Sequence, residues 1–155
     1  MKKKLLIFLI IIFLNICGYI SLYKNNNLNS LDFNFEILES YGDNEINNYL
    51  LSNLNNYQNT SLAKKIGIKI NSTYSKSGIS NDQKGKTTSY NLVVETTFDI
   101  KINEKSSKIV IKEKVRVNRF DDAFEQKNYE KKIKKDMSKL IIDRFINRVS
   151  ILKWF

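Results

Sequence analysis

The sequence predicts an α+β domain of two layers, a two-layer sandwich in which two helices cover one face of a four-stranded, mostly antiparallel sheet. Two kinds of periodicity lead to this prediction. Apolar residues recur at every second position in four segments, which is the pattern of half-buried strands. They recur at every third or fourth position in two other segments, which is the pattern of amphipathic helices. The order along the chain is β-α-β-β-β-α.

The first strand and the first helix are expected near the start of this domain. Phe33, Phe35 and Ile37 fall on one side of an alternating segment. A break at Tyr41–Gly42 follows, and Asp43 has the side chain of a helix N-cap. The apolar residues of the helix recur at intervals of four and three: Ile46, Leu50, Leu54 and Tyr57. We interpret this stripe as core packing.

Three strands are expected next. The second strand contains alternating Ile66, Ile68, Ile70 and Tyr74. The segment Ser75–Gly85 is rich in Ser, Gly and Asn and predicts a flexible loop.

The third strand has the clearest alternation, and its inward residues are Tyr90, Leu92, Val94, Thr96, Phe98, Ile100 and Ile102. The inward residues of the fourth are Ile109, Ile111, Val115 and Val117. One apolar and one polar face are typical of antiparallel strands.

The faces of the third and fourth strands also constrain how these strands pair. A turn at Glu104–Lys105 would pair Phe98 with Ile111 and Glu95 with Lys114. A shift of one residue would bury charged side chains, whereas a shift of two would leave every face unchanged. The parity of the pairing is therefore more strongly constrained than the position of the turn.

The last segment, from about Asp122 to Leu152, has helical periodicity. Asp121 and Asp122 lie near its start, where acidic side chains interact favourably with the helix dipole. The apolar stripe comprises Ile133, Met137, Leu140, Ile141, Phe145, Val149 and Leu152. Lysines between Lys131 and Lys139 occupy the rest of the first half, and we interpret them as a solvated face.

The composition argues against an enzyme. The chain has 155 residues with no His, one Cys and five Gly. His is the usual general base and a common metal ligand, so its absence removes much of catalytic chemistry. A single Cys cannot form a multi-cysteine metal site, and no phosphate-binding glycine loop is present in the sequence. We therefore expect no catalytic residues, no metal site and no cofactor.

The formal net charge of +10 is a weak guide to partners when taken alone. The chain has 22 Lys against 4 Arg, with 20 Asn and no Pro, a bias typical of A/T-rich codon usage. The positions of the cations are more informative than their number. We expect no nucleic-acid partner for two reasons. The cationic start Lys2–Lys4 and the apolar run Leu5–Leu14 are typical of a secretory signal, and no glycine–aromatic RNA-binding motif marks the strands.

The amino terminus has the three parts of a secretory signal. Lys2–Lys4 precede the apolar run Leu5–Leu14, and Cys17 follows at a processing site. A lone Cys directly after a signal core is typical of bacterial lipoproteins, in which it is acylated and becomes the first residue. The acyl chains of such lipoproteins bury many methylene groups in the bilayer, and this holds the protein to the membrane durably. The sequence therefore predicts that Cys17 carries a lipid.

This arrangement divides the chain into three parts. We expect a signal peptide at residues 1–16, a lipidated amino terminus and tether at 17–31, and a single α+β domain at 32–155. Ile16 departs from the small residue that usually precedes such a cysteine. The alternative is an uncleaved anchor that extends to Leu22.

A row of cations on the outer face of the third and fourth strands is the candidate binding surface. Lys112, Lys114 and Arg116 project from one strand at two-residue steps, and the predicted register places Lys101 opposite Lys108 at the hairpin tip. Fixed cations in this arrangement suit a phosphate-bearing ligand. The alternative is a solvated surface that discourages edge-to-edge aggregation.

Three parts of the sequence match the pattern of one known family. Cys17–Tyr23 is similar to an opening CG[FY]xPLY, with Ser21 where Pro is usual. The other two parts are Ile46–Leu54, and Ser89–Asn91 with the strands that follow and the helix Tyr129–Arg148. They resemble the opening, the first helix and the carboxy-terminal half of the LptE family of lipopolysaccharide-assembly lipoproteins, in a divergent, alphaproteobacterial type.

The resemblance implies a non-catalytic lipoprotein of the outer membrane that faces the periplasm and a barrel lumen. Such proteins plug the lipopolysaccharide-transport β-barrel LptD, assist its assembly, and bind lipopolysaccharide on its way to the outer leaflet. The implied partners are therefore an LptD-like barrel, lipopolysaccharide, and the membrane through palmitate-type acyl chains. The basic row comes from the charge pattern and not from residues matched to the family. The alternative is an uncleaved, membrane-tethered basic module that binds anionic lipid surfaces.

Overall fold

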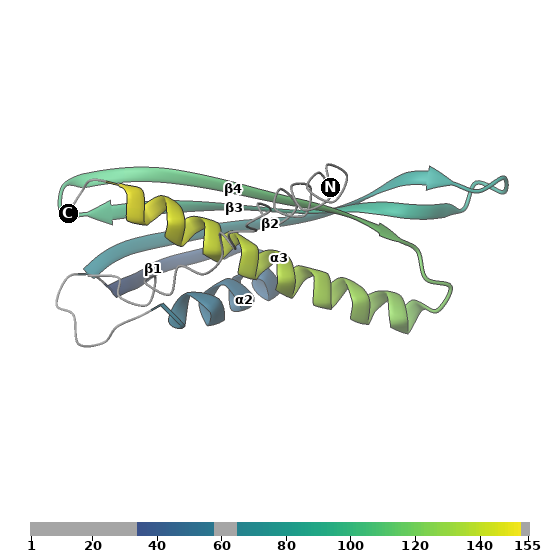
Figure 1. The fold of residues 1–155 in the computed structure, drawn as a ribbon, viewed down its shortest axis with the longest axis horizontal. Coiled ribbons are helices and arrows are strands. Elements are labelled where there is room, and N and C mark those ends of the chain that lie inside the picture. Colours follow the sequence, from purple (N-terminus) through teal and green to yellow (C-terminus); the bar gives the residue numbers. More distant parts are fainter. Residues whose placement is uncertain (1–33, 58–64, 153–155) are drawn as a thin grey trace, which may run out of the picture.

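The computed structural model describes residues 34–57 and 65–152, which form four strands and two helices (Figure 1). The elements are β1 (Asn34–Gly42), α2 (Asn44–Asn55), β2 (Lys65–Asn81), β3 (Thr87–Ile102), β4 (Lys105–Asn118) and α3 (Ala123–Ile151). The predicted α+β class and element order are confirmed. Neither described helix is long and apolar enough to cross a membrane.

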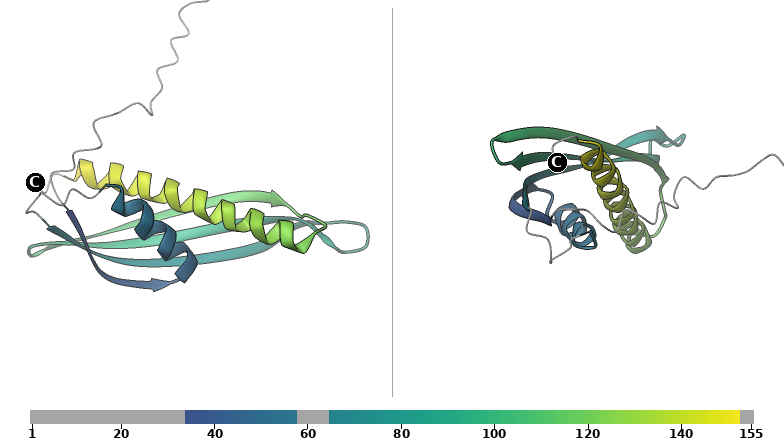
Figure 2. Two further views of the ribbon diagram at one scale, coloured as in Figure 1. Left: turned by 90° about the horizontal axis from the view of Figure 1, so that it is seen from below. Right: turned by 60° about the vertical axis from the view of Figure 1, so that its left-hand side comes forward.

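The domain has one sheet layer and one helix layer. The strand order is β1-β2-β3-β4, with β1 parallel to β2 and the other neighbours antiparallel. Both helices lie against the same face of the sheet, and the described residues leave the opposite face uncovered (Figure 2). We call these the covered face and the open face.

A tight turn connects β1 to α2. Gly42 has a φ of +93°, and a Cβ at this position would lie 1.8 Å from the carbonyl oxygen of Ser72, so a side chain does not fit. Asp43 then caps α2, because its Oδ1 accepts a hydrogen bond from the backbone N–H of Ile46 at 2.9 Å. The predicted N-cap is therefore confirmed.

The core lies between the covered face and the two helices. Ile46, Leu50 and Leu54 of α2 are fully buried, as their spacing predicts. Phe145 of α3 stacks on Phe98 of β3 with ring centroids 4.0 Å apart. The inward residues expected in β3 and β4 point into this core or toward its margin.

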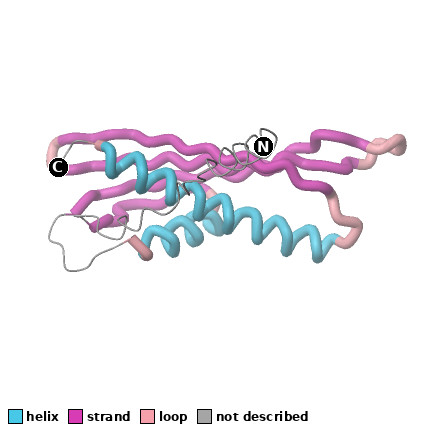
Figure 3. Tube along the Cα trace, in the orientation of Figure 1, coloured by secondary structure: helices cyan, strands magenta, loops and turns pink. Residues whose placement is uncertain are grey.

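The predicted flexible loop at Ser75–Gly85 is wrong. β2 continues to Asn81, with Ser77 paired to Asn91, and only a short turn around Gly85 joins it to β3. Ladder hydrogen bonds join backbone groups, so they form even where polar, exposed side chains give no alternating pattern. This end of the β2–β3 hairpin extends past both helices (Figure 3).

The pairing of β3 with β4 differs from the prediction by two residues. Phe98 pairs with Ile109 and Glu95 with Lys112, since the turn lies at Asn103–Glu104. Asn103 has a φ of +54°, a left-handed conformation that Asn tolerates better than most residues. A two-residue shift preserves parity, so every side chain stays on its predicted face.

The predicted stripe of α3 is partly wrong. Leu140 is 43% exposed, whereas Ile142 and Ile146 are buried together with the expected Ile141 and Phe145. α3 packs against both the sheet and α2, so its buried face is wider than a single stripe at helical spacing. Asp122 caps the helix by accepting a hydrogen bond from the N–H of Glu125 at 2.8 Å.

Candidate functional site

All five predicted cations lie on the open face and are exposed: Lys101, Lys108, Lys112, Lys114 and Arg116. The structure does not bring them together as one row. Lys112 forms an ion pair with Glu95 at 3.1 Å, and this pair lies in the middle of the row. The expectation that Glu95 faces Lys114 is wrong, because the two-residue shift places Lys114 opposite Val93.

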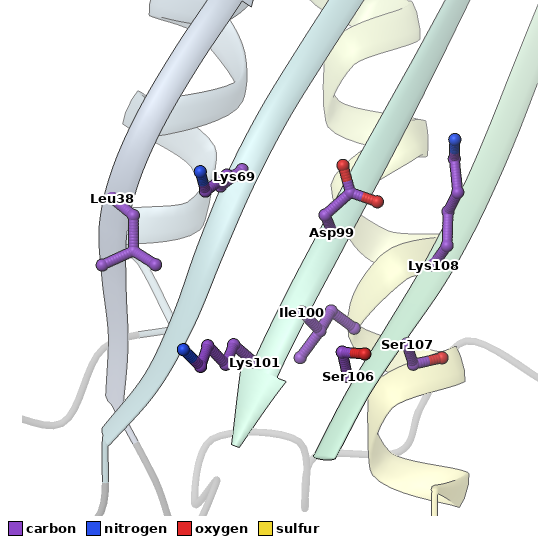
Figure 4. A pocket seen from close by; sticks show the side chains of 8 residues that line it. All are labelled: Leu38, Lys69, Asp99, Ile100, Lys101, Ser106, Ser107 and Lys108. Carbon is purple, nitrogen blue, oxygen red and sulfur yellow. The ribbon is translucent and has the colours of Figure 1, made fainter. Parts of the chain in front are cut away.

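At the end near the β3–β4 turn, cations surround a depression in the open face (Figure 4). The expectation that Lys101 faces Lys108 is wrong, since Lys108 lies opposite Asp99 and Lys101 opposite Ser106. Both lysines nevertheless line this depression of about 350 Å³. Its complete lining is Leu38, Lys69, Asp99, Ile100, Lys101, Ser106, Ser107 and Lys108.

Lys69 is the member of this site that the sequence did not reveal. It lies on β2 opposite Asp99, which in turn lies opposite Lys108 on β4. The row Lys69–Asp99–Lys108 therefore crosses three strands. Only the register between β2 and β3 could have identified Lys69, and that register depends on a hairpin whose length was not predicted.

Lys69 is held in place by β1. Its Nζ lies 2.7 Å from Oε2 of Glu39, and this hydrogen bond raises the pKa of Lys69. The same contact, together with a hydrogen bond from the Tyr41 hydroxyl, lowers the pKa of Glu39. Both groups therefore remain charged at neutral pH, and Lys69 is a fixed cation.

One wall of the depression is apolar. Leu38 is 46% exposed and lies over Gly67 on the open face. A Cβ at Gly67 would come within 2.9 Å of Leu38 Cδ1, so the missing side chain leaves room for the leucine. The site thus presents three ammonium groups and one carboxylate beside an aliphatic side chain. This arrangement can hold the anionic group of an amphipathic molecule.

The other end of the row has a different character. Arg116 donates a hydrogen bond to Ser89 Oγ at 3.3 Å and borders a second depression of about 350 Å³ with Phe120 and Tyr129. The rings of Phe120 and Tyr129 lie 5.1 Å apart. The Glu95–Lys112 pair separates this aromatic end from the lysine depression.

The described residues contain no group of three His, Cys, Asp or Glu side chains placed to hold a metal ion. Cys17, the predicted lipid attachment site, lies outside the described residues, as do the predicted signal peptide and tether.

No model of a known protein family matches the sequence, and no curated protein matches it. Solved structures do match the fold. Rare lipoprotein B from Shewanella oneidensis superposes with a TM-score of 0.56 at 14% identity, covering 74% of this chain and 94% of that one. Uncharacterized lipoprotein B from Nitrosomonas europaea gives 0.54 at 17% identity, covering 78% and 86%.

A third structure, a putative lipoprotein from Caulobacter crescentus, gives a TM-score of 0.50 at 10% identity and covers 78% of this chain and 88% of that one. The chain shares the fold of these bacterial lipoproteins. At such identities the likeness is one of fold, and it extends over most of each lipoprotein.

Proposed function

We propose that this protein is a non-catalytic, outer-membrane lipoprotein that plugs and helps to assemble the lipopolysaccharide-transport β-barrel and binds lipopolysaccharide during its delivery. Three findings support the proposal: the fold shared with bacterial lipoproteins, the signal and cysteine at the amino terminus, and the cations of the open face. The lysine depression is the observation that carries the binding function.

Lipid A carries phosphates next to acyl chains, and the depression has a complementary arrangement. Lys101 and Lys108 have no carboxylate within 4 Å among residues 34–57 and 65–152, so their charge is available to a phosphate. Lys69 adds a third cation, and Leu38 offers an apolar contact beside it. Charge-assisted hydrogen bonds from such ammonium groups are stronger than neutral ones.

The binding function is tested by capture of lipopolysaccharide on the immobilised protein. We expect the double variant Lys101→Glu/Lys108→Glu to reduce capture by about tenfold, because it places like charges beside the lipid phosphates. The matched control is Lys132→Glu/Lys139→Glu, which makes the same change of charge on the exposed side of α3. Equal losses for the two variants would assign the binding to overall charge.

The barrel and anchor functions need separate tests. Purification of the protein from outer membranes should recover a large β-barrel protein as its partner. Intact-mass measurement should show loss of residues 1–16 and the added mass of acyl groups on Cys17. A full-length, unmodified chain would contradict the anchor.

A further inference from the structure

β2 has a stretch of edge that no described residue covers. β1 pairs with β2 only as far as Gly42 opposite Ser72, whereas β2 continues to Asn81 against β3. The positive φ of Gly42 and the cap at Asp43 turn the chain out of the sheet and into α2. The position that β1 leaves beside Thr73–Asn81 is therefore empty among residues 34–57 and 65–152.

The backbone of this edge is available for hydrogen bonding. The carbonyl oxygen of Ser72 points to the β1 side, since it accepts a hydrogen bond from the N–H of Asp43 at 2.9 Å. Residues two apart in a strand direct their backbone groups to the same side. Tyr74, Lys76 and Gly78 therefore each direct one N–H and one C=O to the edge of β2 that β1 leaves after Ser72. This alternation ends at the irregularity after Gly78.

The edge of β4, by contrast, carries charged side chains, and one of its carbonyl oxygens is already bonded. Arg148 of α3 donates a hydrogen bond to the carbonyl oxygen of Val110 at 2.9 Å, and lysines flank this point along the strand. On β2 the one charged side chain of the open stretch is held away from the edge. Lys76 is ion-paired with Glu130, and its Nζ lies 4.2 Å from the centre of the Tyr90 ring. A common protection against strand addition is thus in place on β4 and not on β2.

A cationic depression of about 400 Å³ adjoins this edge on the covered side. Its lining includes Lys127, Lys131 and Phe124 of α3. Two lining residues contact β2: the Nζ of Lys134 lies 4.2 Å from the centre of the Tyr74 ring, and Glu130 is ion-paired with Lys76.

The charges in the depression do not balance. Lys134 is paired with Glu45 at 2.7 Å, and Glu130 is paired with Lys76. Lys127 and Lys131 have no carboxylate within 4 Å in the described part of the chain, and Phe124 is 72% exposed. The depression therefore suits an acidic side chain with an apolar neighbour.

We propose that the edge Thr73–Gly78 accepts an extended, acidic segment of a partner protein as an additional strand, with acidic side chains directed toward Lys127 and Lys131. Backbone hydrogen bonds then supply affinity and the depression supplies specificity, as in other cases of strand addition. A polypeptide fits better than a lipid, because the edge alternates donors and acceptors and an acyl chain has neither.

The probe is an acetylated octapeptide of alternating valine and glutamate, added to the isotope-labelled full chain. We expect hydrogen-exchange NMR to show at least about tenfold slower exchange at the amides of Tyr74, Lys76 and Gly78. The corresponding valine–lysine peptide should not slow them. Slow exchange at these amides without peptide, or on adding phosphatidylglycerol vesicles instead, would overturn the proposal in favour of self-association or lipid.

Two pairs of variants separate backbone pairing from charge. Lys76→Pro removes one edge N–H and should abolish peptide binding, whereas Lys76→Ala keeps that N–H and should bind within about fivefold of the unchanged protein. Lys127→Glu/Lys131→Glu should weaken binding by at least about tenfold, and Lys132→Glu/Lys139→Glu by less than about threefold. The charge pair keeps the backbone unchanged and is therefore an independent test. Equal binding by both members of the charge pair would overturn the proposal.

Discussion

The two halves of α3 are held against the domain by different interactions. From Met137 to Val149 the helix buries apolar side chains against the sheet and α2, with Phe145 stacked on Phe98. From Ala123 to Asp136 no side chain is fully buried. This half contacts the domain through the partly buried Ile133 and through ion pairs of Glu130 with Lys76 and Lys134 with Glu45.

The difference separates stability from surface chemistry. Burial of large apolar side chains contributes most of the free energy of folding, whereas partly exposed ion pairs contribute little each. We therefore expect the carboxy-terminal half of α3 to anchor the helix and the amino-terminal half to open locally without unfolding the core. Lys127 and Lys131 of the proposed peptide site belong to the amino-terminal half.

The largest effect should come from Phe145 in the carboxy-terminal half of α3, with Phe124 in the amino-terminal half as its comparison. Phe145→Ala removes a fully buried ring that packs on Phe98 and Phe35, and we expect it to destabilise the domain by about 3–5 kcal/mol. Phe124→Ala, in the other half, should change stability by less than about 0.5 kcal/mol, because its ring is 72% exposed. Urea denaturation measures both. Similar losses would remove the distinction between the halves.

A second test concerns the turn between β1 and α2. Gly42→Ala should cost at least about 2 kcal/mol, because the new Cβ would meet the backbone of Ser72 in a left-handed conformation. Gly85→Ala is the matched control: its φ of +77° is also left-handed, but no atom of the described residues lies within 4 Å of the new Cβ. We expect a cost of about 1 kcal/mol there. Equal shifts in Tm would show that the close approach at Gly42 has no energetic consequence.

One substitution should stabilise the core beneath the covered face of the sheet. The Oγ1 of Thr96 is buried among the core residues and has no hydrogen-bond partner in the described part of the chain. Thr96→Val replaces the hydroxyl by a methyl group of similar size, and we expect a gain of about 1 kcal/mol in the free energy of unfolding. Thr97→Val on the neighbouring, less buried position is the control and should change stability less. A loss of stability in Thr96→Val would indicate that the hydroxyl has a partner in solution.

The smallest effect on global stability should come from the polar contacts of the amino-terminal half. Glu130→Gln weakens the pair with Lys76, and we expect a cost below about 1 kcal/mol. Its local effect should be larger: amide exchange around Tyr129 should accelerate while that around Ile141 stays unchanged. Acceleration along the whole helix would mean that the two halves open as one unit.

The local features of the fold could be read from the sequence because each is recorded in a short segment. The cap at Asp43 and the buried face of α2 depend on neighbouring residues only. Alternation in β3 and β4 identified which side chains point inward. It also placed the candidate cations on the open face, since period-two alternation survives a shift of register by two.

The sequence by itself thus determined the element order, the faces and the helix starts of this protein. Tertiary structure decided how far β2 extends, which residues pair across β3 and β4, and that Lys69 joins Lys101 and Lys108. The physical reason is that strand pairing uses backbone groups common to almost all residues, so no local pattern specifies the partner. The open edge beside Thr73 arises in the same way, because it depends on where β1 leaves the sheet and not on the residues of β2.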